Sequence, residues 1–275
     1  MKKLILLTAL SLVSLPAFAQ CTGETRTFDA VDPVDKTDWK ISTKMYVPRT
    51  KNAPVVFVLP PIVGETILDR RMAARFCANG MAAYIIQVVR EVSRERDVSD
   101  LRVHDESYDR ALGGVRQLIT TLDREAGVRL NYGLLGMSLG GMFSAFVAGS
   151  EPRISATVIV ASGGDVPSVL ATSDQESVVA QRNARIRNFG LIDSMSYEDL
   201  LRKSITNDPV AVAGNIAPGS LYMFIATSDT TVPTRNQRLL RDAVREPLVF
   251  NVSSAHTATL IKASTLHAGK ITSFL

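Results

Sequence analysis

A glycine-rich motif, Gly-Met-Ser-Leu-Gly at positions 136–140, restricts this chain more than any other stretch. The segment 131–135 before it predicts a short buried strand, and the run 139–148 after it predicts a helix. Between a strand and a helix, small residues on both sides of Ser138 let the backbone turn sharply. Leu139 opens the helix, so its N–H is free to donate to an oxygen beside the serine. The motif predicts a nucleophilic serine at a strand-to-helix corner.

Residues 1–19 predict an export signal. They combine a basic start, an apolar run at 4–15 and a small-x-small pattern that ends at Ala19. The apolar run is too short to span a bilayer, and no other stretch approaches transmembrane length. We expect cleavage after Ala19 and a periplasmic or secreted protein. A lipid anchor on Cys21 is the alternative, although Gln20 departs from the small residue that such a site requires.

The charge of the chain gives no reason to expect a nucleic-acid partner. The formal net charge of +4 falls to +2 once the two lysines of the export signal are removed. The sequence contains no dense Lys/Arg patch with interleaved aromatic residues. The run 90–97 is mixed in sign and predicts a solvated loop. Without a repeat or linker, we expect one α/β domain over 20–275 with a sizeable core.

The chain has two cysteines, Cys21 and Cys77. Export permits a disulfide between them. Such a bond would close a loop of about 56 residues and stabilise the fold by about 4 kcal/mol in the chain-entropy model. The alternative is two unpaired thiols, with Cys77 buried on a helix. We expect the disulfide, which would hold the start of the mature chain in place.

The order of apolar runs predicts an α/β fold with a mostly parallel sheet of about eight strands. Two early strands come first, and buried strands then alternate with helices, so helices should cover both faces of the sheet. The expected strands lie at 26–30, 39–47, 54–59, 81–89, 131–135, 155–161, 220–227 and 248–252. The expected helices lie at 66–79, 98–126 (starting near Ser99 or Asp100), 139–148, 234–245 and 257–274.

The alternation stops between 165 and 215. This polar segment contains helix-like pieces near 175–186 and 197–204 and is too long for a simple connection. We expect a helical cap inserted over the carboxyl edge of the sheet; a surface helix pair with no role in binding is the alternative. Its cationic side chains either meet an acidic substrate or form a solvated helix face, and we expect the solvated face. They are Arg182, Arg185 and Arg187.

Ser138, Asp229 and His256 each follow directly after a predicted strand. A serine hydroxyl is a poor nucleophile at neutral pH, so it needs a base within hydrogen-bond reach, and the base needs a carboxylate to orient it. Functional groups of open parallel sheets lie beyond the carboxyl ends of the strands. We therefore expect these three residues to meet there, with Ser138 as nucleophile, His256 as base and Asp229 as acid.

Other histidines and carboxylates are weaker candidates. His104 lies before or at the start of a helix and His267 inside the last predicted helix, so we expect surface or packed roles for both. Asp165 follows a strand and is the alternative acid, whereas Asp242 lies within a helix. The alternative for Asp229 is an ordinary turn residue.

Two N–H donors should face an oxyanion beside the serine. Leu139 supplies the first. The second should come from the loop after the third strand, where two prolines lack an N–H. Ile62 is the first residue there that can donate, and Val63 is the alternative. No group of His, Cys and carboxylates has metal-ligand spacing, and this chemistry needs no metal or organic cofactor.

These residues resemble those of the α/β-hydrolases over essentially all of the mature chain. Within that superfamily the chain is similar to the dienelactone hydrolase-like group. The similarity lies in Ile62-Val63-Gly64, the run 79–84, the run 136–141, Ser228-Asp229 with Val232-Pro233, and His256. The resemblance implies the same triad, Ser138, Asp229 and His256, and the same oxyanion donors, Leu139 and Ile62.

The chain also departs from that group. Its namesake enzymes use cysteine where this chain has Ser138, and a glutamate where it has Pro61. The lactone substrate is therefore not carried over. The leading hypothesis is an exported serine hydrolase that cleaves small-molecule carboxylic esters through an acyl-enzyme. A serine peptidase of the same fold is the second hypothesis, although no propeller or peptide-docking domain is evident. A non-catalytic relative that binds a ligand or partner is the third, and the complete set of triad positions argues against it.

Overall fold

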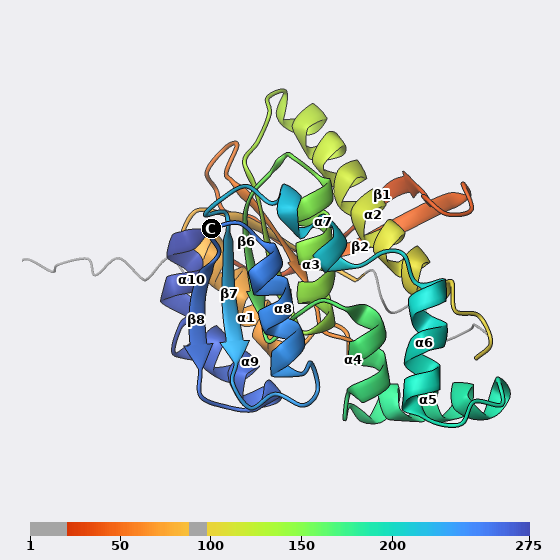
Figure 1. The fold of residues 1–275 in the computed structure, drawn as a ribbon. Helices are drawn as coiled ribbons and strands as arrows, with labels where there is room; N and C mark the ends of the chain where they lie inside the picture. The colour runs from red at the N-terminus through yellow and green to blue at the C-terminus, as the bar shows by residue number, and fades with distance from the viewer. Residues whose placement is uncertain (1–20, 88–97) are drawn as a thin grey trace, which may run out of the picture.

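The computed structural model describes residues 21–87 and 98–275 (Figure 1). The predicted export signal at 1–19 and the predicted loop at 90–97 lie outside the described residues. No helix in the described part of the chain is both long and apolar enough to cross a membrane.

The described residues form one eight-stranded sheet. Its strands are β1 (Glu24–Val31), β2 (Asp38–Tyr46), β3 (Val55–Leu59), β4 (Ala82–Ile86), β5 (Tyr132–Met137), β6 (Ile154–Val160), β7 (Leu221–Ala226) and β8 (Leu248–Val252). They lie in the order β1-β2-β4-β3-β5-β6-β7-β8. β2 is antiparallel to both of its neighbours, and the remaining pairs are parallel. The prediction of a mostly parallel sheet of about eight strands is confirmed.

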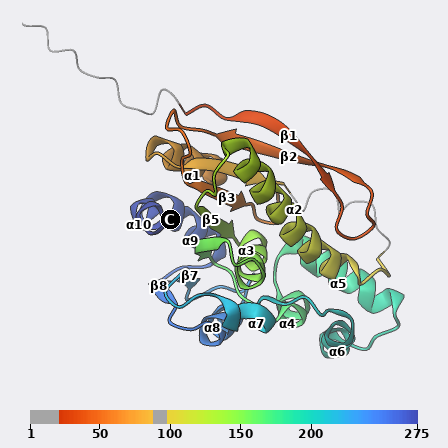
Figure 2. The same cartoon turned by 90° about the horizontal axis from the view of Figure 1, so that it is seen from above.

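Helices cover both faces of this sheet (Figure 2). They are α1 (Ile67–Ala78), α2 (Val103–Ala126), α3 (Leu139–Ser150), α4 (Val166–Thr172), α5 (Glu176–Asn188), α6 (Ser194–Ser204), α7 (Pro209–Val212), α8 (Thr234–Ala243), α9 (His256–Thr265) and α10 (Ala268–Phe274), with a 3-10 turn η2 (Ala213–Asn215). Side chains of α1, α9 and α10 share a core with one face of the sheet. Those of α2, α3 and α8 pack on the other face.

The central strand β3 shows why its sequence is apolar at every position. Val56 and Val58 point into the core beneath α1 and α10, whereas Val55, Phe57 and Leu59 point into the core beneath α2 and α3. Because side chains alternate along a strand and both faces are covered, each position meets a helix. Every residue of β3 is accordingly buried.

Several predicted boundaries were wrong. α2 begins at Val103 rather than near Ser99 or Asp100, because the Asp100 carboxylate accepts the N–H of Arg102 (3.0 Å) and forms a local turn before the helix. The single helix predicted at 257–274 is two helices, α9 and α10. They are separated where the N–H of His267 donates to the Lys262 carbonyl (3.0 Å), one residue farther back than the helical repeat.

The segment 165–215 contains α4 to α7 and η2. The two predicted helical pieces correspond to α5 and α6, whereas α4 and α7 were not predicted. Asp208 caps α7 and also accepts the backbone N–H groups of Asp165 (3.0 Å) and Val166 (2.6 Å). The first residues of the segment are thereby tied to a point near its end. Figure 1 shows α5 and α6 on the side of the molecule away from β8 and α10.

A disulfide joins Cys21 to Cys77, with an S–S distance of 2.09 Å. The bond links the start of the described chain to the last turn of α1. The predicted pairing is therefore present in the structure, and the alternative of two unpaired thiols is not.

Candidate active site

Ser138 lies at the corner between β5 and α3, as the motif predicts. Its backbone angles are φ 54° and ψ −123°, a conformation that is strained for any residue with a side chain. The Ser138 N–H donates to the carbonyl of Val160 on the neighbouring strand β6 (2.9 Å). The surrounding sheet and helix therefore hold the serine in a conformation that an isolated chain would leave.

The flanking glycines permit this corner because backbone atoms approach them closely. A Cβ atom on Gly136 would lie 2.3 Å from the carbonyl oxygen of Gly140, and one on Gly140 would lie 1.9 Å from the carbonyl oxygen of Leu59. Both distances are far below a non-bonded contact, so neither position accepts a side chain without moving the backbone. The motif thus lets the start of α3 pack directly against the end of β3.

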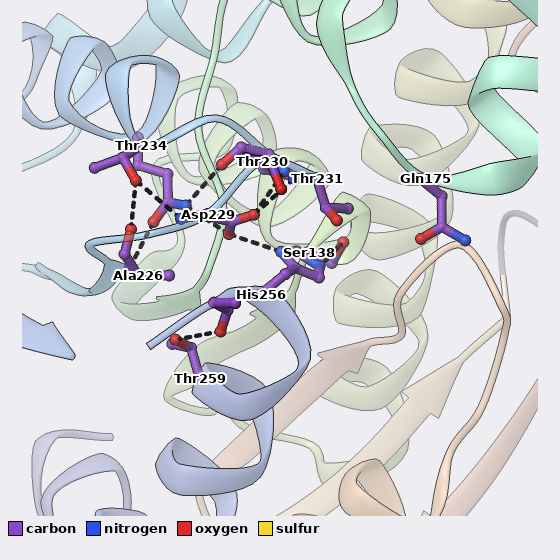
Figure 3. Close-up of polar contacts among 12 residues, drawn as sticks. Ser138, Gln175, Ala226, Asp229, Thr230, Thr231, Thr234, His256 and Thr259 are labelled. Atoms are coloured by element: carbon purple, nitrogen blue, oxygen red, sulfur yellow. Dashed lines mark hydrogen bonds and ion pairs between the residues drawn. The ribbon is translucent and has the colours of Figure 1, made fainter. Parts of the chain in front are cut away.

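The three predicted residues come together in one hydrogen-bonded chain (Figure 3). Nε2 of His256 lies 3.0 Å from Oγ of Ser138, and Nδ1 of His256 lies 2.7 Å from Oδ2 of Asp229. Asp229 follows β7, and His256 begins α9 just after β8. The three parallel strands end at the same edge of the sheet, so residues far apart in the sequence become neighbours.

The Asp229 carboxylate accepts hydrogen bonds from four donors. Its Oδ1 accepts the backbone N–H groups of Thr231 (2.9 Å) and Val232 (3.0 Å). Its Oδ2 accepts Nε2–H of Gln237 (2.8 Å) in addition to the bond from His256. Because an ionised carboxylate only accepts, a neutral His256 carries its proton on Nδ1 and presents Nε2 to Ser138 as an acceptor.

Gln237 is a polar residue of the site that the sequence reasoning missed. Its side chain is fully buried on α8. Its Oε1 accepts the N–H of Ala226 (3.0 Å), so Nε2 is the atom that faces Asp229 and the carbonyl of Val232 (2.8 Å). In the sequence Gln237 is an ordinary position within a helix. Only the packing of α8 against the end of β7 gives it a role.

Ile62 and Leu139, the predicted oxyanion donors, line the same pocket as Ser138. Leu139 is the first residue of α3, so its N–H has no acceptor within the helix. Ile62 lies in a turn closed by the hydrogen bond from Gly64 N–H to the Pro61 carbonyl (2.8 Å), and its own N–H has no acceptor among the described residues. Val63, the alternative donor, is 72% exposed and lies outside the pocket lining.

The alternative acids lie in other networks. Asp165 caps α4 and forms an ion pair with Arg202 (3.0 Å). Asp242 is exposed on α8 and pairs with Arg241 (2.7 Å). Neither contacts His256, so Asp229 is the carboxylate that the structure brings to the predicted base.

The alternative histidines are also engaged elsewhere. His267 lies between α9 and α10, not inside a helix as predicted, and its ring packs on Phe224 and Phe250. His104 lies on α2 and its Nε2 accepts a hydrogen bond from Nη1 of Arg185 (2.7 Å). Burial, together with the Arg185 charge, lowers the pKa of His104 to about 3. The His104 ring is therefore neutral near neutral pH.

A pocket of about 410 Å³ opens beside Ser138. Its walls are mostly apolar, and nearly half of its lining residues come from the segment 165–215. Gln175, which is labelled in Figure 3, is one of the lining residues from this segment. Such a volume is typical of a small-molecule site. Within the described ranges, no group of three His, Cys, Asp or Glu side chains is arranged to hold a metal ion.

The expectation that the arginines of α5 form a solvated face was wrong for two of the three. Arg185 is only 1% exposed and lines the pocket. Arg182 donates to the carbonyls of Ala171 and Ser173 (both 3.0 Å) at the end of α4. Arg187 alone is exposed, as predicted. The reason is that α5 contacts α4 and α6 on one side, where Arg185 also reaches the residues at the start of α2, whereas the opposite side of the helix is exposed.

Asp174 connects the segment 165–215 to the turn that carries Asp229. Its carboxylate accepts the hydroxyl groups of Thr230 and Thr231 (2.7 Å for Thr231), and these two bonds hold the pKa of Asp174 below its usual value. Asp174 lies between α4 and α5, next to the pocket residues Ser173 and Gln175. The wall of the pocket is thus bonded to residues adjacent to the acid.

Comparisons with known proteins give matches among solved structures. No family model matches the chain, and neither does any curated protein sequence. A cold-adapted esterase from an Arctic intertidal metagenomic library is similar in structure, with a TM-score of 0.63 and 15% identity over 92% of this chain and 94% of that chain. An α/β hydrolase from a Penicillium species gives a TM-score of 0.63 and 13% identity over 92% of this chain and 97% of that chain.

An acylaminoacyl peptidase of Pyrococcus horikoshii is also similar, with a TM-score of 0.63 and 15% identity over 90% of this chain but only 41% of that chain. At such identities the likeness concerns the fold, and the dienelactone hydrolase-like subgroup stays a prediction. The sheet order, the corner at Ser138 and these structural neighbours agree, and the chain has the α/β-hydrolase fold.

Proposed function

We propose that this protein is a serine hydrolase that cleaves carboxylic ester bonds of small molecules, with Ser138, His256 and Asp229 as its catalytic residues. The observation that carries the proposal is the hydrogen-bonded chain from Ser138 Oγ through His256 to Asp229 beside a largely apolar pocket. Two backbone N–H groups that have no acceptor among the described residues, those of Ile62 and Leu139, border the same pocket and match the needs of an oxyanion hole.

In this mechanism Ser138 Oγ attacks the ester carbonyl while His256 Nε2 takes the hydroxyl proton. Asp229 holds the imidazole in place and stabilises the imidazolium that forms. The N–H groups of Ile62 and Leu139 donate to the developing oxyanion. His256 then gives its proton to the departing alkoxide, which leaves as the alcohol. A water molecule, activated by His256, attacks the acyl-enzyme and releases the acid and free Ser138.

The proposal also includes a role for the segment 165–215 and the export of the chain. We infer that the segment 165–215 is a cap that closes the acyl pocket, because it supplies nearly half of the lining. We also infer that the chain is exported and loses residues 1–19. The Cys21–Cys77 disulfide supports export, because structural disulfides persist in oxidising compartments. A peptidase is the second candidate, since one structural neighbour is an acylaminoacyl peptidase.

The decisive experiment combines a serine-reactive probe with hydrolysis assays. We expect a fluorophosphonate to label Ser138 and p-nitrophenyl esters to be hydrolysed. Ser138→Ala should abolish labelling and lower kcat by about 10⁴-fold or more, because the nucleophile is removed. Ser253→Ala, which changes an exposed serine close to His256 in the sequence, is the control and should keep full activity.

Undiminished hydrolysis by Ser138→Ala would overturn the proposal. Absence of labelling in folded wild-type protein would instead favour a binding role. Comparison of matched ester and anilide substrates separates the esterase from the peptidase, since only the latter should cleave the anilide at a comparable rate.

A further inference from the structure

The pocket beside Ser138 has one charged side chain among its described lining residues, the guanidinium of Arg185. None of these lining residues is Asp or Glu. Arg185 is 1% exposed, and a guanidinium stays protonated at any physiological pH. Burial of a cation is costly unless an anion or strong hydrogen bonds offset the loss of water.

The partners of Arg185 are all neutral. Nε donates to the carbonyl of Val98 (3.0 Å) and Nη2 to the carbonyl of Asp100 (3.3 Å). Nη1 donates to the hydroxyl of Tyr197 (3.1 Å) and to Nε2 of His104 (2.7 Å). These bonds occupy four of its five N–H groups, so one N–H on Nη2 has no acceptor among the described residues. Within the described ranges no carboxylate forms an ion pair with Arg185.

Two further donors lie in the same wall of the pocket. Because His104 is neutral and its Nε2 accepts from Arg185, its proton is on Nδ1, and none of the described residues accepts that N–H. The hydroxyl of Tyr108, a residue that is 2% exposed and lines the pocket, is buried without a hydrogen-bond partner in the described part of the chain. As far as the described residues form it, the wall therefore offers a positive charge and spare donors but no negative group.

We propose that Arg185 forms an anion subsite of the acyl pocket, and that the preferred substrates are esters whose acyl chain ends in a carboxylate. This inference rests on the proposed esterase function. The desolvation of Arg185 is already complete in the folded protein, so an incoming anion loses only its own hydration and gains a charge-assisted bond in a low-dielectric site. A carboxylate carries one negative charge, which one guanidinium balances, whereas a phosphate monoester carries up to about two.

The wild-type protein supplies the first test, without any variant. The substrates are p-nitrophenyl half-esters of dicarboxylic acids of increasing length, each paired with the neutral ester of the same acyl length. The leaving group is the same throughout, so kcat/KM reports on the acyl pocket. We expect the half-ester to exceed its neutral counterpart by about tenfold or more at the best length. Preference for the neutral ester at every length would overturn the subsite but leave the proposed function intact.

A matched pair of arginine variants supplies the second test. Arg185→Met should lower the ratio of kcat/KM between half-ester and neutral ester by about 10- to 100-fold. Arg187→Met removes the same charge from the exposed side of the same helix and should leave that ratio unchanged. An equal fall in both variants would mean a general charge effect, and an unchanged ratio in Arg185→Met would mean a purely structural arginine; either overturns the inference.

Active-site titration separates failure of the subsite from failure of the fold. Rates are expressed per site that a neutral fluorophosphonate labels, so misfolded protein does not enter the ratio. If Arg185→Met yields no labelled sites, the ratio of kcat/KM between half-ester and neutral ester in the wild-type protein decides whether the anion subsite exists. If wild-type protein neither reacts with the probe nor cleaves any ester, the proposed function fails, which is a different outcome from hydrolysis without acid preference.

Discussion

Gln237 fixes the orientation of the carboxylate on which the proposed base depends. Its Oε1 accepts the Ala226 N–H, so its Nε2 must face Oδ2 of Asp229. Oδ2 is also the atom that accepts from His256. A small rotation of Asp229 would move that oxygen away from the imidazole. In the proposed mechanism Gln237 is therefore a positioning residue, because it contacts Asp229 and neither Ser138 nor His256.

Gln237→Glu tests this role with almost no change in shape. The new side chain keeps an acceptor for Ala226 but places an oxygen where a donor faced Asp229. Burial and the neighbouring carboxylate should raise the pKa of the introduced Glu. Above that pKa the two charges repel, and we expect kcat to fall by about tenfold or more with a smaller change in KM. Below it the protonated Glu donates to Asp229 again.

The measurement is the ratio of kcat between Gln237→Glu and wild type across the pH range in which both are folded. We expect the ratio to rise as the pH is lowered. A merely structural role for Gln237 predicts a ratio that does not depend on pH, and that result would contradict the positioning role.

Residues at strand ends could be predicted from the sequence, whereas residues inside helices could not. Ser138, Asp229 and His256 follow apolar runs, and parallel strands bring their carboxyl ends to one edge whatever the details of packing. The roles of Gln237 and Arg185 depend on which neighbour each helix face meets. For Arg185 a polar helix pattern favoured solvent, because nothing local indicates that α2 and α6 cover it.

At the scale of elements, the site depends on how closely α3 approaches β3. The carbonyl oxygen of Leu59, the last residue of β3, occupies the space that a side chain at position 140 would need. This contact places the first N–H groups of α3 next to the loop that carries Ile62. The proposed oxyanion donors are thus brought together by an element contact that only glycine allows.

Gly140→Ala should therefore be severely destabilising. A Cβ 1.9 Å from the Leu59 oxygen forces α3 away from the sheet, and we expect a loss of about 3 kcal/mol or more in the free energy of unfolding. Gly214→Ala is the matched control, because a Cβ there meets nothing within 4 Å, and it should change stability by less than about 1 kcal/mol. Urea unfolding checks both. Similar midpoints for the two variants would refute the close contact.

The short helices show where sequence patterns fail at this scale. α4 and α7 span seven and four residues, too few for a helical period to emerge. Both are stabilised at their first turn by capping aspartates, Asp165 and Asp208. The boundary of α9 likewise depends on the packing of His267 against the phenylalanines of the sheet, which is a tertiary contact.

At the scale of the whole molecule, the disulfide connects the start of the described chain to the helical layer. Cys77 is buried at the end of α1, and Cys21 precedes β1. Without the bond, β1 at the edge of the sheet is retained by its pairing with β2 and by the contacts of its side chains. The bond therefore acts mainly by restricting the unfolded chain.

Reduction of the disulfide should lower the free energy of unfolding by about 2–4 kcal/mol, since the bond closes a loop with a sequence separation of 56. We expect ester hydrolysis at moderate temperature to persist, because the bond contacts none of the site residues. Urea unfolding with and without reductant gives the difference. A double variant, Cys21→Ser with Cys77→Ala, should have the lower stability and no response to reductant. A wild-type urea midpoint that is the same with and without reductant would contradict the expectation.

The parallel sheet also determines where a carrier or fusion partner can be joined to this protein without covering the pocket. Cys77 lies in the last turn of α1, shortly before β4 begins, and the side chain of Leu275 lies against Gly133 near the beginning of β5. Both ends of the described chain therefore lie at the amino edge of the sheet, and Figure 1 shows the C-terminus opposite the arrowheads of β7 and β8. A carrier, bead or fused protein joined at Leu275 would leave the mouth of the pocket facing outward.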